Sequence, residues 1–268
     1  MESLATRLLI AAMGSRAFVK IQLKNTMKVK IPEFNLKGAP LVLNEKVEAC
    51  LTYAFNDPLG GIKVFTSPQG SGKTTYIRRY ANRFIGEGGH VRFFGSELKS
   101  VDDFFLAFGD ADRRRDLFDV IPIKSAIIID QLDYLGTPSA DFERLIRHLA
   151  LESRRTAECN IILLLSNCEI AKRVLSLNGL DKINAGGKAA DFEWNKQLIS
   201  TYVDEICNRW SADDRSTMKT LGNIARCPTF LHGVLTAYPL GLPHDKVELH
   251  NTAKLYDKEW NKYASTGL

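Results

Sequence analysis

The 268-residue sequence lacks several features that would place it in a familiar class at once. No apolar run approaches the roughly 20 residues needed to cross a bilayer, so no transmembrane segment is predicted. The five cysteines are odd in number and scattered, and the absence of a Cys-x-x-Cys pair argues against a zinc knuckle or a disulfide framework. Repeats and low-complexity tracts are also missing. We therefore expect an ordinary globular protein of a reducing, intracellular compartment, the cytoplasm or nucleus.

Net positive charge is missing outside one end of the chain. The net charge is +5, and residues 1–38 alone hold seven Lys or Arg against two Glu. Residues 39–268 hold 29 charges of each sign, unlike a DNA-binding body with its own basic excess. Three interpretations of the basic N-terminal arm, residues 1–40, stay open: an extension that docks one apolar face, an arm for nucleic acid or a membrane surface, and an organelle transit peptide in residues 1–20. The last would place the protein in an organelle matrix.

Short apolar runs alternate with helical patterns through the middle of the chain. Strands are predicted at residues 63–67, 90–95, 126–129 and 161–165. The last two runs are apolar throughout, which is typical of strands buried on both faces. The alternation predicts an α/β domain over residues 41–190, with a parallel sheet sandwiched by helices. Beyond it the pattern turns helical, and residues 191–268 are predicted to form a helical, lid-like region.

A glycine-rich loop stands between the first predicted strand and the helix that follows it. From Ser67 to Thr74 it reads Ser-Pro-Gln-Gly-Ser-Gly-Lys-Thr, which fits a phosphate-binding loop except that Ser67 stands at the usual first glycine. The glycines let backbone N–H groups point at phosphate oxygens, and the helix adds its positive end. Lys73 supplies a charge for the β and γ phosphates, and Thr74 offers a hydroxyl to Mg²⁺. The predicted nucleotide-binding residues are Gly70, Ser71, Gly72, Lys73, Thr74 and Thr75.

A carboxylate follows the isoleucine run of the strand predicted at 126–129. Asp130 therefore lies at the carboxyl edge of the sheet, the edge of the phosphate loop, and is predicted to complete the Mg²⁺ site with Thr74. Next along the chain is Gln131, where many ATPases of this type carry a glutamate that polarises the attacking water. A neutral amide can position water but cannot accept its proton. Asp133 is the nearest alternative base, so we expect slow hydrolysis or a role for Asp133.

The next buried strand also ends in polar residues, Ser166 and Asn167. In a parallel sheet these lie at the same edge as Asp130. Asn167 is predicted to sense the γ-phosphate or the attacking water, and the competing interpretation is a cap for the following helix. With Lys73, Asp130, Gln131 and Asp133, it completes the candidate catalytic set.

The order of these motifs resembles the AAA+ ATPases. The segment from Asp130 to Thr137 resembles the second nucleotide motif of origin-recognition and replication-initiator ATPases, and also the Asp-Gly-Leu-Asp-Glu motif of STAND signalling ATPases. Asn167 matches the strand-end sensor of AAA+ proteins. Near the C-terminus, Arg226 resembles the second-sensor arginine of initiators, a nucleotide contact, and Pro228 resembles a lid proline of STAND ATPases. The resemblance covers residues 44–238 and implies ATP and Mg²⁺ as cofactors.

One departure concerns assembly. After the first sensor these families carry an arginine that reaches the nucleotide of a neighbouring subunit, and the segment from Ser176 to Gly179 lacks it. The alternatives are Arg173, Arg154 and Arg155, each of which also fits a solvated helix position. A homo-oligomer with catalysis in trans is thus left open.

Three functions fit this set of motifs. The first is an AAA+ ATPase that remodels or loads a nucleic-acid or protein assembly. The second is a slowly hydrolysing nucleotide-dependent switch of STAND type, which changes partner affinity through its lid. The third is a small-molecule kinase, for which the basic run Arg113–Arg115 would serve as a mobile lid. The paired strand ends at Asp130 and Asn167 argue against the kinase.

Overall fold

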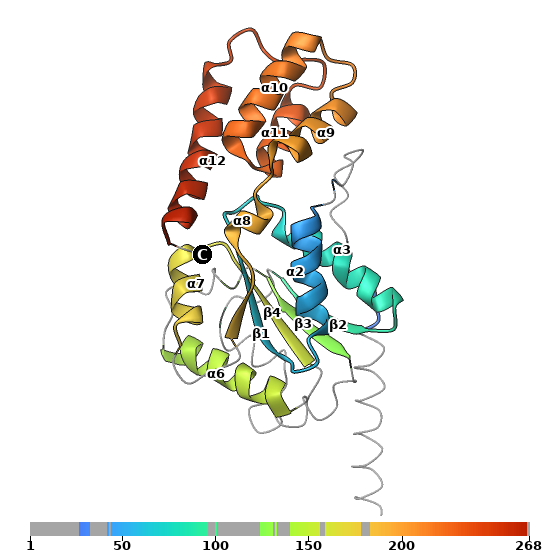
Figure 1. Ribbon diagram of the computed structural model, residues 1–268, viewed down its shortest axis with the longest axis vertical. Coiled ribbons are helices and arrows are strands. Elements are labelled where there is room, and N and C mark those ends of the chain that lie inside the picture. The colour runs from blue at the N-terminus through green and yellow to red at the C-terminus, as the bar shows by residue number, and fades with distance from the viewer. Residues whose placement is uncertain are drawn as a thin grey trace, which may run out of the picture.

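The computed structural model describes residues 27–32, 42, 44–95, 100, 124–130, 132, 140–155, 159–177 and 183–266. Within them, a sheet with helices on both faces adjoins a bundle of helices (Figure 1). The predicted α/β class with a helical C-terminal region is confirmed, and the domain boundaries at residues 40 and 190 stay predictions. The N-terminal arm before Met27, the Arg113–Arg115 run and most of the helix predicted from Ser100 lie outside the described residues.

The sheet has five parallel strands in the described part of the chain, in the order β2-β3-β4-β1-β5. The strands are β1 (Gly61–Thr66), β2 (His90–Phe94), β3 (Ser125–Ile129), β4 (Cys159–Leu165) and β5 (Ile183–Gly187). The first four match the predicted strands. Because every pair is parallel, the carboxyl ends of all strands meet at one edge, which is where the candidate site lies.

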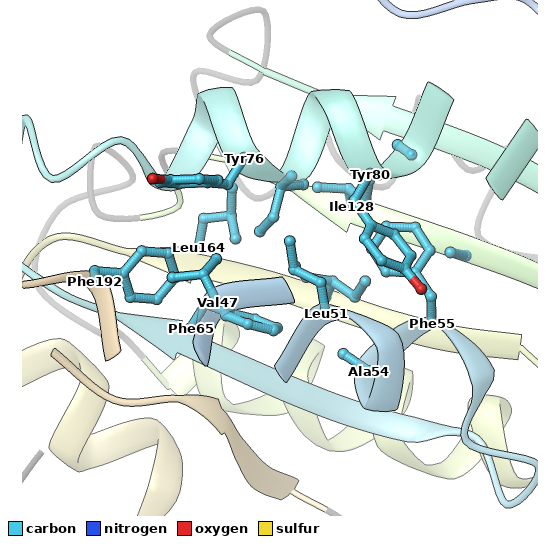
Figure 2. Packing of buried hydrophobic residues seen from close by; sticks show 14 of the residues in the cluster. Val47, Leu51, Ala54, Phe55, Phe65, Tyr76, Tyr80, Ile128, Leu164 and Phe192 are labelled. Carbon is cyan, nitrogen blue, oxygen red and sulfur yellow. The ribbon is translucent and has the colours of Figure 1, made fainter. Parts of the chain in front are cut away.

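Both faces of the sheet are covered, which explains why its central strands are apolar throughout. The covering helices are α2 (Glu45–Asn56), α3 (Lys73–Gly86), α6 (Ala140–Arg155) and α7 (Cys168–Leu175). Successive strand residues point to opposite faces, so Leu164 packs with α2 and α3 while Leu163 packs with α6 and α7. Figure 2 shows the first of these layers, in which Phe65 and Leu164 of the sheet cluster with Leu51 of α2 and Tyr76 of α3.

Strand β5 is the element that sequence reasoning missed. It reads Ile-Asn-Ala-Gly-Gly, without the apolar run or alternation that predicts a strand. Its glycines are required by a neighbour: a Cβ on Gly186 would lie 2.5 Å from Cε2 of Phe65, and one on Gly187 would lie 2.8 Å from Cδ1 of the same ring. The ring of Phe65 thus fills the space that side chains of β5 would occupy, and only the tertiary structure reveals this.

The C-terminal helices form a second unit with its own core. They are α9 (Lys196–Ile206), α10 (Ala212–Ala225), α11 (Pro228–Ala237) and α12 (Val247–Thr266). The short helix α8 (Ala189–Phe192) before them buries Ala189 and Phe192 in the core between α2, α3 and the sheet. We call α9 to α12 the lid. Its core includes Ile199, Met218 and Leu231, all fully buried. Among the described helices, none is both long enough and apolar enough to span a bilayer.

Helix α12 links the lid to the sheet domain. Its first half buries Leu249 and Ala253 in the lid core, whereas its second half buries Trp260 and Tyr263 in the cluster between α2, α3 and the sheet. The long helix runs down from the lid along one side of the molecule (Figure 1). One rigid element therefore contributes to both cores and fixes their relative orientation.

Candidate nucleotide-binding site

The phosphate loop joins the buried strand β1 to helix α3 at the carboxyl edge of the sheet. Gly70 and Gly72 adopt φ angles of +83° and +91°, a region that L side chains disfavour, and Gly72 is the N-cap of α3. Ser67, at the position of the missing glycine, is fully buried, and its Oγ lies 2.6 Å from Oγ of Ser71. This hydroxyl pair closes the loop, which explains how a serine is accommodated there.

Lys73 is the first residue of α3, and its side chain turns back over the loop. Its Nζ donates to the carbonyl of Ser67 at 2.6 Å and to that of Pro68 at 3.2 Å. The residue is only 5% exposed, so a positive charge is held in a partly desolvated loop. A charge held this way attracts an anion more strongly than the same charge in bulk water. The loop is thus arranged for a phosphate group.

Thr74 and Asp130 meet across the edge of the sheet. Oγ1 of Thr74 donates to Oδ2 of Asp130 at 2.8 Å, and the backbone N–H of Asp130 donates to the carbonyl of Phe94 at 2.8 Å, which fixes the aspartate beyond β3. A hydroxyl and a carboxylate are hard oxygen donors of the kind that Mg²⁺ takes together with waters and phosphate oxygens. The residues present therefore fit a magnesium ion.

The order of the strands in the sheet differs from their order along the chain, because β4 lies between β1 of the phosphate loop and β3, which leads to Asp130. The contact with Thr74 still forms because the helix after the loop reaches over the end of β4. The register places Thr66 beside Leu165, so the polar end of β4 sits next to the loop.

Asn167, at that end of β4, caps helix α7. Its Oδ1 accepts hydrogen bonds from the backbone N–H groups of Glu169 at 2.9 Å and Ile170 at 3.2 Å. The capping interpretation therefore describes the geometry, and the sensor role stays a prediction. The two roles are compatible in one respect, because the cap uses the amide oxygen and leaves the amide nitrogen as a donor.

The lid contacts the phosphate loop through the start of α11. The carbonyl of Gly70 accepts from Oγ1 of Thr229 at 2.8 Å, from the backbone N–H of Thr229 at 3.4 Å and from Sγ of Cys227 at 3.1 Å. Pro228 lies between them, with its Cγ 3.6 Å from the position that a Cβ on Gly72 would take. Burial raises the pKa of the Cys227 thiol, which keeps it a neutral donor. Sequence reasoning missed Cys227 and Thr229, because nothing local links them to Gly70.

Solved structures with a similar fold include two DnaA proteins and a Walker-type ATPase. Domain III of the Thermotoga maritima replication initiation protein DnaA superposes with a TM-score of 0.51 at 11% identity, over 87% of this chain and 95% of that one. AMPPCP-bound DnaA from Aquifex aeolicus gives 0.51 at 13% identity, over 85% and 71%. A Walker-type ATPase of Pyrococcus abyssi gives 0.53 at 11% identity, over 90% and 77%. The chain has the fold of AAA+ P-loop ATPases. No family model and no curated protein matches the sequence.

Within this AAA+ fold, Arg226, the residue that resembles a second-sensor arginine, makes its hydrogen bonds with the segment before α9 and with α12. It sits at the αL cap between α10 and α11, with φ +52°. Its Nη1 donates to Glu193 at 2.6 Å, and its Nη2 donates to Oδ1 of Asp257 at 2.5 Å and of Asn261 at 3.2 Å. The guanidinium thus ties the segment before α9 to α12. A nucleotide contact by Arg226 stays a prediction and requires it to exchange these partners.

The remaining candidates are distributed as follows. Thr75 lies in the first turn of α3, and Arg173 pairs with Glu143 of α6 at 2.7 Å. Gln131 and Asp133 lie outside the described residues, so their predicted roles stay open. The side chains of Arg154 and Arg155 are not described either.

A pocket of about 820 Å³ lies near the loop but does not include it. It is bordered by the N-terminus of α2, by α8 and by α9, and its walls include Val42, Glu193 and Asn195. One wall is connected to the nucleotide-binding helix, because the hydroxyl of Tyr76 on α3 donates to the carbonyl of Val42 at 3.0 Å.

Proposed function

We propose that this chain binds ATP with Mg²⁺ and hydrolyses it to remodel or load a nucleic-acid or protein assembly inside the cell. The observation that carries the proposal is the 2.8 Å contact between Thr74 and Asp130, made beside the buried ammonium of Lys73. A hydroxyl, a carboxylate and an ammonium within one glycine-rich loop and strand end are what a magnesium–triphosphate group requires. The free state of all five cysteines agrees with an intracellular, reducing setting.

Each residue of the site has a role in this proposal. The backbone of Gly70, Ser71 and Gly72 wraps the phosphates, Lys73 neutralises the β and γ phosphates, and Mg²⁺ is held by Thr74 and Asp130 with Thr75 at the edge of the loop. When bound, the ion neutralises the charge that develops on the phosphates. Gln131 positions the attacking water, and without a carboxylate there hydrolysis is slow unless Asp133 accepts the proton.

A nucleotide-dependent switch is the second candidate, and the lid contact favours it. Three donors from Cys227 and Thr229 converge on the carbonyl of Gly70, so a phosphate that reshapes the loop also reshapes the lid junction. In this version of the function, hydrolysis returns the lid to its position without ATP, and the affinity for the partner depends on the position of the lid.

Calorimetry and rate measurements on the same preparations test the proposal. The parent should bind ATP, more tightly with Mg²⁺ than without, and release phosphate. Lys73→Ala should lose binding, while Lys172→Ala, which removes an exposed lysine on α7, should behave like the parent. Normal ATP binding by Lys73→Ala would show that the phosphate site lies elsewhere. Fast hydrolysis stimulated by DNA or RNA favours the first function, and tight binding with negligible turnover favours the switch.

A further inference from the structure

The lid packs directly on the phosphate loop at Gly70. A Cβ on this glycine would lie 3.0 Å from Cβ of Thr229 and 3.3 Å from Sγ of Cys227, so the contact leaves no room for a side chain. The carbonyl of Gly70 accepts from Oγ1 of Thr229 at 2.8 Å and from the thiol at 3.1 Å. The first distance is that of a good O–H···O bond, whereas a thiol is a weak donor. Thr229 therefore supplies most of this contact.

The peptide bond from Gly70 to Ser71 is held on both of its sides. Because the peptide is trans, its carbonyl and its N–H point in opposite directions. The carbonyl points to the lid, and the N–H of Ser71 donates to the carbonyl of Pro68 at 3.3 Å. That carbonyl of Pro68 also accepts from Nζ of Lys73 at 3.2 Å. The N–H of Ser71 therefore lies on the Lys73 side of the loop, the side proposed to bind phosphate.

Glycine gives this peptide plane unusual freedom. Gly70 has φ +83° and no Cβ, so sterics do little to restrict rotation of the plane about its Cα. Rotation would bring the negative end of the carbonyl dipole toward the Lys73 side and turn the N–H of Ser71 away. Both changes oppose the binding of an anion. The hydroxyl of Thr229 resists the rotation, because a rotated carbonyl would lose this hydrogen bond.

The start of α11 is itself held by the sheet domain and by α12. Arg226, in the turn before α11, donates to Glu193 at 2.6 Å and to Asp257 of α12 at 2.5 Å, and its carbonyl accepts from the N–H of Trp194 at 3.3 Å. The second half of α12 is packed in the core of the sheet domain. Thr229 is therefore presented to the loop from a fixed position, and a shift of the lid withdraws it.

We infer that Thr229 is a positioning residue for phosphate binding. By holding the carbonyl of Gly70 toward the lid, it keeps the N–H of Ser71 on the phosphate side, and Cys227 assists it. The loop is then fully arranged for a phosphate chain only while the start of α11 is docked on it. The inference rests on the proposed function, since it concerns the regulation of the same phosphate site, and it makes the position of the lid a determinant of affinity before any hydrolysis.

A contact that only joins the two units would behave differently. Its loss would lower the free energy of unfolding and leave the affinity for phosphates unchanged. Thr229 is exposed and lies in the first turn of α11, so removing its hydroxyl leaves the buried cores intact. The affinity for a bare phosphate chain therefore separates the two roles.

Titration calorimetry of the full chain with Mg²⁺–tripolyphosphate and with Mg²⁺–ATP tests the inference. Tripolyphosphate has no base or sugar, so it reports on the loop alone. Thr229→Val keeps the branched shape and removes the donor, and we expect it to bind both ligands about 3- to 10-fold more weakly, the range of one hydrogen bond. Thr229→Ser keeps the hydroxyl and should bind like the parent. Thr236→Val, the same change at an exposed position of the same helix, is the control.

Three results would overturn the inference while the parent binds both ligands. Thr229→Val binds tripolyphosphate as the parent does, or Thr229→Ser loses as much affinity as Thr229→Val, or Thr236→Val does. Urea denaturation of the same variants completes the test, because a lower midpoint for Thr229→Val with parent affinity is the result expected of a contact that only joins the two units. A parent that binds neither ligand would overturn the proposed function, and this inference with it.

Discussion

At the scale of single residues, the charge of Asp130 decides the magnesium site. Asp130→Asn keeps the size of the side chain and removes its charge. We expect ATP affinity in the presence of Mg²⁺ to fall to the value measured without the ion, because an amide oxygen binds Mg²⁺ weakly. Titration calorimetry with and without Mg²⁺ measures both values, with Asp213→Asn, an exposed change in the first turn of α10, as the matched control. If Mg²⁺ increases the affinity for ATP equally in Asp130→Asn and in the parent, Asp130 does not hold the ion.

A second prediction at this scale concerns Gln131. Gln131→Glu adds a carboxylate where related ATPases carry one, and a positioned general base contributes about 10²- to 10⁴-fold. We expect faster single-turnover hydrolysis with unchanged ATP affinity. The gain will be smaller if Asp133 already accepts the proton, and Asp133→Asn will then be the more damaging change. If Gln131→Glu and Asp133→Asn both hydrolyse ATP at the rate of the parent, the general base comes from elsewhere, for example from another subunit.

The third residue-scale prediction concerns a buried ion pair between Lys63 of β1 and Asp57, the C-cap of α2, at the end of β1 far from the phosphate loop. The two side chains are 1% and 8% exposed. Burial raises the pKa of Asp57, but hydrogen bonds from Lys63 and from the N–H of Leu59 outweigh it and hold the pKa below its ordinary value. Lys63→Met leaves the carboxylate buried without its partner. We expect a loss of about 3–5 kcal/mol in the free energy of unfolding, measured by urea denaturation at neutral pH.

The pH dependence of that variant checks the cause. In the parent the lowered pKa of Asp57 contributes stability above the ordinary aspartate range, and this contribution is lost as pH falls through the folded value. In Lys63→Met the charge and hydrogen bond of Lys63 are lost while burial and the hydrogen bond from Leu59 remain, so we expect the folded pKa of Asp57 to rise above that in the parent and the loss of stability to shrink on acidification as Asp57 becomes neutral. If the difference in free energy of unfolding between the parent and Lys63→Met does not change with pH, its cause is lost packing and not the charge of Asp57.

At the scale of elements, α12 depends on the ion pairs of Arg226. The Arg226 guanidinium is 23% exposed and Asp257 is 39% exposed, so solvent screens the pair and its contribution is at most about 1 kcal/mol. Asp257→Asn should therefore leave the fold intact and speed hydrogen exchange in α12 by about fivefold or less. Glu259→Gln, an exposed change on the same helix, is the control. No difference between the two variants would show that packing of Trp260 and Tyr263 alone holds the helix.

At the scale of the whole molecule, nucleotide should stabilise the chain by linkage. A ligand at about 100 times its Kd adds about 2.7 kcal/mol to the folded state. For a chain of this length, this shifts Tm by about 5–10 °C. Differential scanning fluorimetry with Mg²⁺ and ATP should show the shift in the parent and in Lys172→Ala but not in Lys73→Ala. A shift in Lys73→Ala would mean that ATP binds at a second place.

Features formed by residues close together in the chain could be predicted from the sequence. The loop from Ser67 to Thr74 and the strand before Asp130 were predictable because glycine conformation, helix N-termini and apolar runs act over a few residues. The cap at Asn167 was predictable as one of two alternatives. Strand β5 was not predictable, because its glycines are required by contact with the ring of Phe65, which is distant in the sequence.

The sequence by itself determined a phosphate loop, a carboxylate at the sheet edge and a helical C-terminal region. Only the tertiary structure decided three matters: that β4 separates β1 from β3, that Cys227 and Thr229 bind the carbonyl of Gly70, and that Arg226 faces α12. The reason is physical: hydrogen bonds and charges act between groups that are close in space. Folding brings these groups together from distant segments, and the local sequence pattern of one segment does not indicate which other segment it will contact.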